Sequence, residues 1–93
     1  MRMLTERRTQ ILALAERYRA GDVRVFGSVA RNENSEESDV DLLVKTKRGC
    51  SLFDLGGLLE DLKDLLRCEV DLVTEDGLKP RLRDRVMAEA KPL

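Results

Sequence analysis

The sequence predicts an α/β fold of the α+β kind, in which a small mixed sheet of about three strands is backed by helices. Segments with helical apolar spacing alternate along the chain with short runs of the kind found in strands, and glycine-containing turns lie between them. The 93 residues are 42% hydrophobic but include only three aromatic side chains. This size and composition predict one small domain, residues 1–93, with an aliphatic core.

The predicted elements follow one another as helix, strand, short helix, strand, helix, strand and helix. We predict helices over residues 3–19, 29–32, 51–66 and from Pro80 onward, and strands over residues 22–26, 39–45 and 69–74. The helix over 51–66 is the most regular, and its apolar stripe consists of Leu52, Leu55, Leu58, Leu59, Leu62, Leu65 and Leu66. The adjacent Gly56 and Gly57 in this helix indicate close backbone packing or an irregular start.

The last predicted helix has two kinds of surface. Leu82, Val86 and Ala90 recur at helical spacing, a pattern more typical of a core contact than of an interface. Outside this stripe the helix carries Arg81, Arg83 and Arg85. These three side chains form either a docking surface for a partner or an ordinary solvated face.

Composition restricts the chemistry that the chain can perform. Histidine is absent, and Cys50 and Cys68 lie far apart, which excludes zinc sites of the Cys/His type and every histidine base. A bound metal must therefore have oxygen ligands, as Mg²⁺ and Mn²⁺ do.

Charge and hydropathy indicate where the chain works. The formal net charge of −1 argues against direct nucleic-acid binding, which depends on an excess of Lys and Arg. No apolar run reaches the roughly 18 residues of a membrane span, and no signal-peptide segment opens the chain. We therefore expect a cytoplasmic protein without membrane contact.

A glycine-serine turn after the first predicted strand could bind an anion. Gly27 permits close approach of a ligand, the Ser28 hydroxyl and the following backbone N–H groups can donate to it, and Arg31 adds a cation. Such turns are common in α/β proteins, so an ordinary turn is the alternative interpretation.

Carboxylates on the next two strands strengthen this interpretation. Asp39 and Asp41 alternate along one strand and so share a face, and Asp71 lies on the strand after it. The alternative is a solvated sheet face, but neighbouring carboxylates repel each other and a divalent cation relieves that repulsion. Three carboxylates beside a phosphate-binding turn suit nucleotidyl transfer with two metal ions.

The motif formed by Gly27-Ser28-Val29-Ala30-Arg31 and Ser38-Asp39-Val40-Asp41-Leu42-Leu43-Val44 resembles the signature of the DNA polymerase β-like nucleotidyltransferases. More narrowly, it is similar to the minimal nucleotidyltransferases, and Val70-Asp71-Leu72-Val73 fits the same family. Asn32 departs from the glycine that many relatives have, although asparagine tolerates a left-handed backbone.

The resemblance implies roles for the motif residues. Asp39 and Asp41 would hold two Mg²⁺ ions that bridge the phosphates of ATP, and Asp71 would help to hold the catalytic ion and activate the acceptor hydroxyl. The nucleotide phosphates would be bound by Gly27, Ser28, Arg31 and Ser38. The acceptor hydroxyl would attack the α-phosphate and release pyrophosphate.

The resemblance also implies a partner. Minimal nucleotidyltransferases are usually paired with a helical HEPN-type ribonuclease toxin, and they act as its antitoxin by transferring AMP to a tyrosine hydroxyl. Such a pairing would allow a hetero-oligomer with the toxin. Two alternatives remain at this point. One is an antitoxin that neutralises the toxin by binding alone, and the other is a nucleotidyltransferase that modifies a small molecule.

Overall fold

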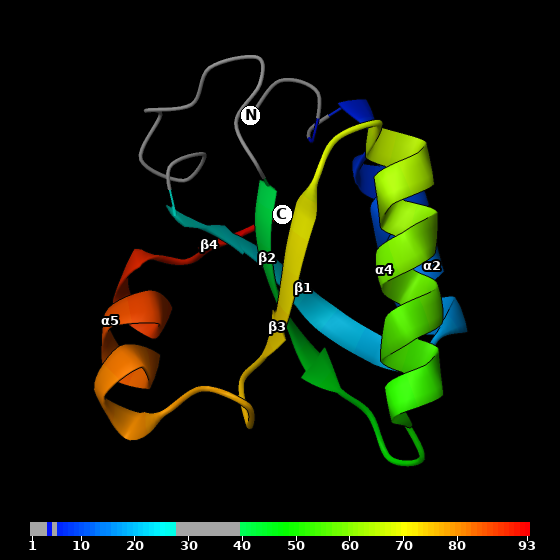
Figure 1. The fold of residues 1–93 in the computed structure, drawn as a ribbon. Helices are drawn as coiled ribbons and strands as arrows, with labels where there is room; N and C mark the ends of the chain where they lie inside the picture. The colour runs from blue at the N-terminus through cyan, green and yellow to red at the C-terminus, as the bar shows by residue number, and fades with distance from the viewer. Residues whose placement is uncertain (1–3, 5, 28–39) are drawn as a thin grey trace.

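The structure, a computed structural model, describes residues 4, 6–27 and 40–93. Its elements are α2 (Arg8–Arg17), β1 (Ala20–Phe26), β2 (Val40–Thr46), α4 (Leu52–Leu66), β3 (Val70–Thr74), α5 (Pro80–Glu89) and β4 (Lys91–Pro92). The strands form a mixed sheet, and the helices lie on its two sides (Figure 1). The predicted α/β class is confirmed, whereas the predicted helix over 29–32 lies outside the described residues.

The sheet has the strand order β3-β2-β1-β4. β2 pairs antiparallel with β1 and parallel with β3, and α4 makes the crossover that a parallel pair requires. The short strand β4 pairs with β1 and adds to the three predicted strands. Two residues cannot display an alternating pattern, so sequence reasoning could not detect β4. Leu93, which follows β4, is tied down because its N–H donates to the Val23 carbonyl at 3.1 Å.

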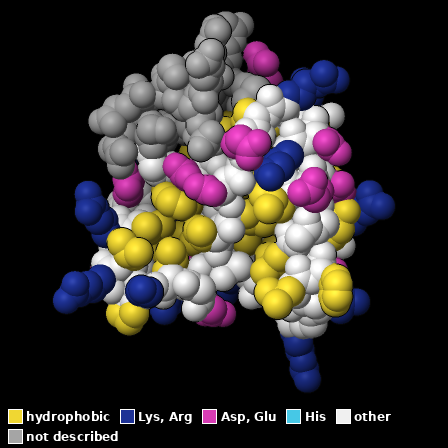
Figure 2. Space-filling model, viewed as in Figure 1, with side chains coloured by type: hydrophobic (Ala, Val, Ile, Leu, Met, Phe, Trp, Pro, Cys, Tyr) yellow, Lys and Arg dark blue, Asp and Glu magenta, His cyan; other side chains and the backbone are white. Residues whose placement is uncertain are grey.

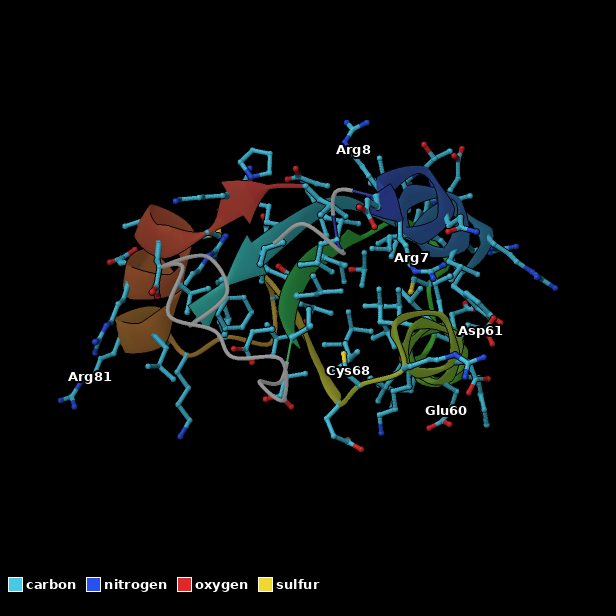
Figure 3. All side chains as sticks on the ribbon, turned by 90° about the horizontal axis from the view of Figure 1, so that it is seen from above. Arg7, Arg8, Glu60, Asp61, Cys68 and Arg81 are labelled. Carbon is cyan, nitrogen blue, oxygen red and sulfur yellow. The ribbon has the colours of Figure 1, made fainter. Side chains whose placement is uncertain are left out.

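One face of the sheet packs against α2 and α4, and α5 lies on the other side (Figures 1 and 3). The side chains of the first face and its two helices form an aliphatic core, as the composition predicted. This core includes Ile11, Ala15, Val23, Val25, Val40, Leu42, Val44, Leu58, Leu62 and Leu66. Within the described residues, no helix is long and apolar enough to cross a membrane.

A bulge in β1 keeps both of its ends in this core. The register with β2 shifts between Gly21 and Arg24, so that Asp22 and Val23 together face Val44. Asp22 takes a left-handed backbone, with φ of 46°, and its side chain points to solvent while Val23 is buried. The extra residue therefore changes the side-chain alternation and lets Ala20 and Val25 share the buried face.

The start of α4 is capped by its own side chains. Ser51 precedes the helix, and its hydroxyl accepts a hydrogen bond from the Asp54 N–H at 3.2 Å. The Asp54 carboxylate in turn accepts from the Ser51 N–H at 2.9 Å. This capping box satisfies two backbone donors and fixes where the helix begins.

α2 and α4 approach each other closely at Gly57. A methyl group on Gly57 would come 2.7 Å from the Tyr18 ring, whereas one on Gly56 would meet nothing within 4 Å. The Tyr18 hydroxyl donates to the Asp61 carboxylate at 2.5 Å across the same contact. Gly57 is therefore the member of the pair that serves close packing.

Two predicted apolar stripes are only partly buried. Leu52, assigned to the stripe of α4, is 85% exposed, and Leu82 of α5 is 50% exposed. Nothing in α5 is fully buried, so its predicted core stripe is wrong. Helical spacing shows which side chains share a stripe, but it does not show whether another layer covers that stripe.

Candidate active site

Three strand ends meet at one edge of the sheet. β1 ends at Phe26 and runs antiparallel to β2, so its end lies beside the start of β2. β3 runs parallel to β2, so it also starts at this edge. Gly27 follows β1, and Asp41 and Asp71 are the second residues of β2 and β3. The topology therefore brings these three motif residues to one edge of the sheet.

Asp41 and Asp71 are direct neighbours across the parallel pair β2–β3. The register pairs Asp41 with Asp71, so both side chains leave the same face of the sheet. Neighbouring strands lie about 4.8 Å apart, which brings the two carboxylates within reach of a single cation. Asp41 is half-buried and Asp71 is exposed, so a ligand can approach the pair from solvent.

Gly27 lies directly against the Asp41 carboxylate. Its φ is +73°, a left-handed conformation that glycine adopts without strain. A methyl group at this position would overlap Asp41 Oδ2 and would come 3.0 Å from its Cγ. The absent side chain at Gly27 thus makes the space that the Asp41 carboxylate occupies.

The face that carries the two carboxylates is apolar farther along the strands. Leu43 follows Asp41 on this face and is fully buried, and the register places Val73 beside it. Leu43 is not part of the core under α2 and α4. The carboxylates therefore stand at the polar end of a face that becomes apolar toward the middle of the sheet.

The other predicted site residues lie outside the described part of the chain. These are Ser28, Arg31, Ser38 and Asp39. Their predicted roles remain predictions, and the same holds for the roles of the three that the structure brings together.

The donor atoms at this edge suit a hard divalent cation. Asp41 and Asp71 offer carboxylate oxygens, the ligands that Mg²⁺ prefers, and the space at Gly27 lets the Asp41 carboxylate stand at the edge. Among the described residues, no group of three or more acidic or cysteine side chains forms a complete metal site. Asp39, the third carboxylate of the motif, lies outside the described residues.

Two side chains with displaced pKa values lie elsewhere. The hydrogen bond to Asp61 raises the pKa of Tyr18, and burial raises the pKa of the Cys50 thiol. A raised thiol pKa lowers the thiolate fraction, which argues against Cys50 as a nucleophile. Both groups belong to the packing around α4 and not to the edge that carries Asp41.

Known proteins with similar sequences point to one family. The nucleotidyltransferase domain family matches residues 7–93. A putative protein adenylyltransferase of Methanocaldococcus jannaschii is 38% identical over 87 residues, which cover 94% of this chain and 94% of the relative.

Solved structures show the same fold. A structure described as a putative minimal nucleotidyltransferase superposes with a TM-score of 0.90 at 50% identity, over 99% of this chain and 94% of the other. A toxin-antitoxin crystal structure with AMP-PNP superposes with a TM-score of 0.77 over 90% of this chain and 69% of the other. At 22% identity, the second likeness concerns the fold alone.

Proposed function

The chain belongs to the nucleotidyltransferase domain family, and from this premise we propose that it is a Mg²⁺-dependent protein adenylyltransferase. It transfers AMP from ATP to a hydroxyl group of a partner protein. The observation that carries the proposal is the pairing of Asp41 with Asp71 at the edge where Gly27 makes room for the Asp41 carboxylate. The relative from M. jannaschii, whose name describes a protein adenylyltransferase, supports a protein acceptor.

The proposed roles follow the chemistry of the side chains. Asp39, Asp41 and Asp71 hold Mg²⁺, which neutralises phosphate charge when it is bound. Gly27, Ser28, Arg31 and Ser38 bind the nucleotide phosphates.

The transfer exchanges a phosphoanhydride bond of ATP for a phosphoester bond to the acceptor. The acceptor oxygen forms a bond to the α-phosphorus of ATP while the bond from that phosphorus to the α–β bridging oxygen breaks. Pyrophosphate leaves, and the hydroxyl proton passes to the Asp71 carboxylate. Asp71 is exposed, which suits a group that must meet an acceptor from another molecule.

We propose a helical HEPN-type toxin as the acceptor protein, modified on a tyrosine hydroxyl, with this chain as its antitoxin in the cytoplasm. The toxin-antitoxin structure with AMP-PNP supports this partner, because a chain of the same fold is there part of a toxin-antitoxin pair. AMP-PNP is an analogue of ATP, which supports ATP as the AMP donor.

The test mixes the purified chain with a HEPN-type protein as candidate acceptor, ATP and Mg²⁺, and measures the mass of the acceptor. We expect a gain of one or more AMP units, which chelation of Mg²⁺ abolishes. Asp41→Asn and Asp71→Asn should each lower the rate at least about a hundredfold. Asp76→Asn is the matched control, because Asp76 is exposed in the turn after the other end of β3.

Two results would contradict the proposal. In the first, the acceptor is fully neutralised without being modified, both by the wild-type chain and by the variant Asp39→Asn/Asp41→Asn/Asp71→Asn. That result would identify an antitoxin that works by binding alone. In the second, ATP is consumed with a small-molecule acceptor but not with the protein acceptor. That result would identify a nucleotidyltransferase that modifies a small molecule.

A further inference from the structure

Two large apolar side chains project into solvent from the first turn of α4. Leu52 is 85% exposed and Phe53 is 92% exposed. They are the first two helical residues after Ser51. The space-filling view shows apolar side chains gathered at this end of α4, with Lys and Arg side chains close by (Figure 2).

These side chains are presented from a rigid start of the helix. The reciprocal hydrogen bonds between Ser51 and Asp54 fix the first turn, and the Leu55 N–H donates to the Ser51 carbonyl at 3.1 Å. A partner that covers Leu52 and Phe53 therefore has little backbone to order, which lowers the entropic cost of binding.

Basic residues also lie near the start of α4. The turn that leads into α4 contains Lys47 and Arg48, both exposed. Arg19 lies over the same turn, since a methyl group on Gly49 would come 2.5 Å from its Nη1. The Lys47 N–H also donates to the Arg19 carbonyl at 2.8 Å, so the backbones of these two basic residues lie side by side.

We propose that Leu52, Phe53, Arg19, Lys47 and Arg48 form a docking surface for the acceptor protein, which covers it with an apolar cleft bordered by acidic side chains. This inference rests on the proposed function, because it names the same acceptor. The basic border favours an acidic protein surface, and it disfavours a second copy of this chain joined through the same surface, since like charges would meet.

The docking surface lies at the opposite end of β2 from the candidate active site. β2 runs from the edge with Asp41 to Thr46, and the turn then leads into α4 (Figure 1). A docked acceptor would therefore leave that edge open to ATP. The longest dimension of the domain is 35 Å, which a helix of about 23 residues spans, so one helical protein can reach both ends.

The test compares binding and catalysis for the wild-type chain and the variant Leu52→Ser/Phe53→Ser. Isothermal titration with the purified acceptor should show that its Kd rises about a hundredfold, as expected when two large apolar side chains are lost from an interface. The KM for the acceptor should rise in parallel, while kcat at saturating acceptor stays the same. Thermal unfolding should be unchanged, because both side chains are exposed.

A second variant tests the basic border. Arg48→Glu should slow association about tenfold and reduce the salt dependence of the Kd. Arg81→Glu is the matched control, because Arg81 is exposed on α5, on the other side of the sheet, and points away from it (Figure 3).

The outcomes separate this inference from the proposed function. A wild-type chain that binds the acceptor through Phe53 but transfers no AMP contradicts the proposed function and supports the docking surface. A wild-type chain that transfers AMP, with the Leu52→Ser/Phe53→Ser variant binding equally well, overturns the docking surface. Binding to anionic lipid vesicles or self-association that depends on Phe53, without an effect on acceptor binding, also overturns it.

Discussion

Replacing Gly27 with alanine should damage the candidate site far more than it damages the fold. The added methyl group would overlap Asp41 Oδ2 and would lie 3.0 Å from the Asp41 Cγ, so the carboxylate has to move. A displacement of about 1 Å is enough to cost about a hundredfold in rate when the displaced group takes part in catalysis. We therefore expect AMP transfer to fall about a hundredfold in Gly27→Ala.

The effect of this substitution on stability should be modest. Alanine at φ of +73° is strained by about 1–2 kcal/mol relative to glycine. Gly27 lies just after β1 and outside the aliphatic core, so the methyl group does not disturb packing between the sheet and its helices. Urea unfolding should thus show a loss of about 1–2 kcal/mol and an unchanged m-value.

The assay measures the initial rate of AMP transfer at saturating ATP and acceptor, together with urea unfolding of the same preparation. Gly56→Ala is the matched control, because a methyl group at Gly56 meets nothing within 4 Å. It should retain full activity and gain about 0.5–1 kcal/mol in stability, since alanine is the better helix former. A folded Gly27→Ala protein with a rate within threefold of the wild type would refute the assignment of Gly27 and Asp41 to the active site.

Three further predictions concern the packing of α4, and urea unfolding measures each of them. Gly57→Ala should destabilise the domain by about 1–3 kcal/mol, because the methyl group would press on the Tyr18 ring. This effect is opposite in sign to that of Gly56→Ala, and equal effects at the two glycines would contradict the contact with Tyr18. Ser51→Ala should cost about 1 kcal/mol by removing the bond to the Asp54 N–H. Tyr18→Phe should cost about 1 kcal/mol through the lost bond to Asp61, and no change would show that this bond contributes nothing.

Much of the fold could be predicted because its long elements have a clear period. The leucines of α4 and the apolar run of β2 are local signals, and they located both elements to within one residue of their observed ends. The start of β1 at Ala20 was missed because the bulge at Asp22 and Val23 interrupts the alternation. The exposure of Leu52 was also missed, since no local pattern reveals where the neighbouring layer ends.

The candidate site was harder to predict from local patterns, since its parts come from three strands. The sequence predicted that Asp41 and Asp71 lie on strands, but their direct pairing depends on the parallel register of β2 and β3, which is a property of the whole fold. Gly27 was predicted as a place of close approach to a ligand. Its contact with the Asp41 carboxylate needed the antiparallel pairing of β1 with β2.

The core on one face of β2 enforces the position of the carboxylates on the other. Val40, Leu42 and Val44 are buried under α2 and α4, and a slip of one residue would move all three to the opposite face. Losing their burial would cost roughly 5–9 kcal/mol, at about 1.5–3 kcal/mol for each side chain. Repulsion between like charges at neighbouring strand positions is only about 0.2–1 kcal/mol. The apolar face is therefore strong enough to hold Asp41 beside Asp71 without a cation, so the fold itself positions the two carboxylates that we propose as metal ligands.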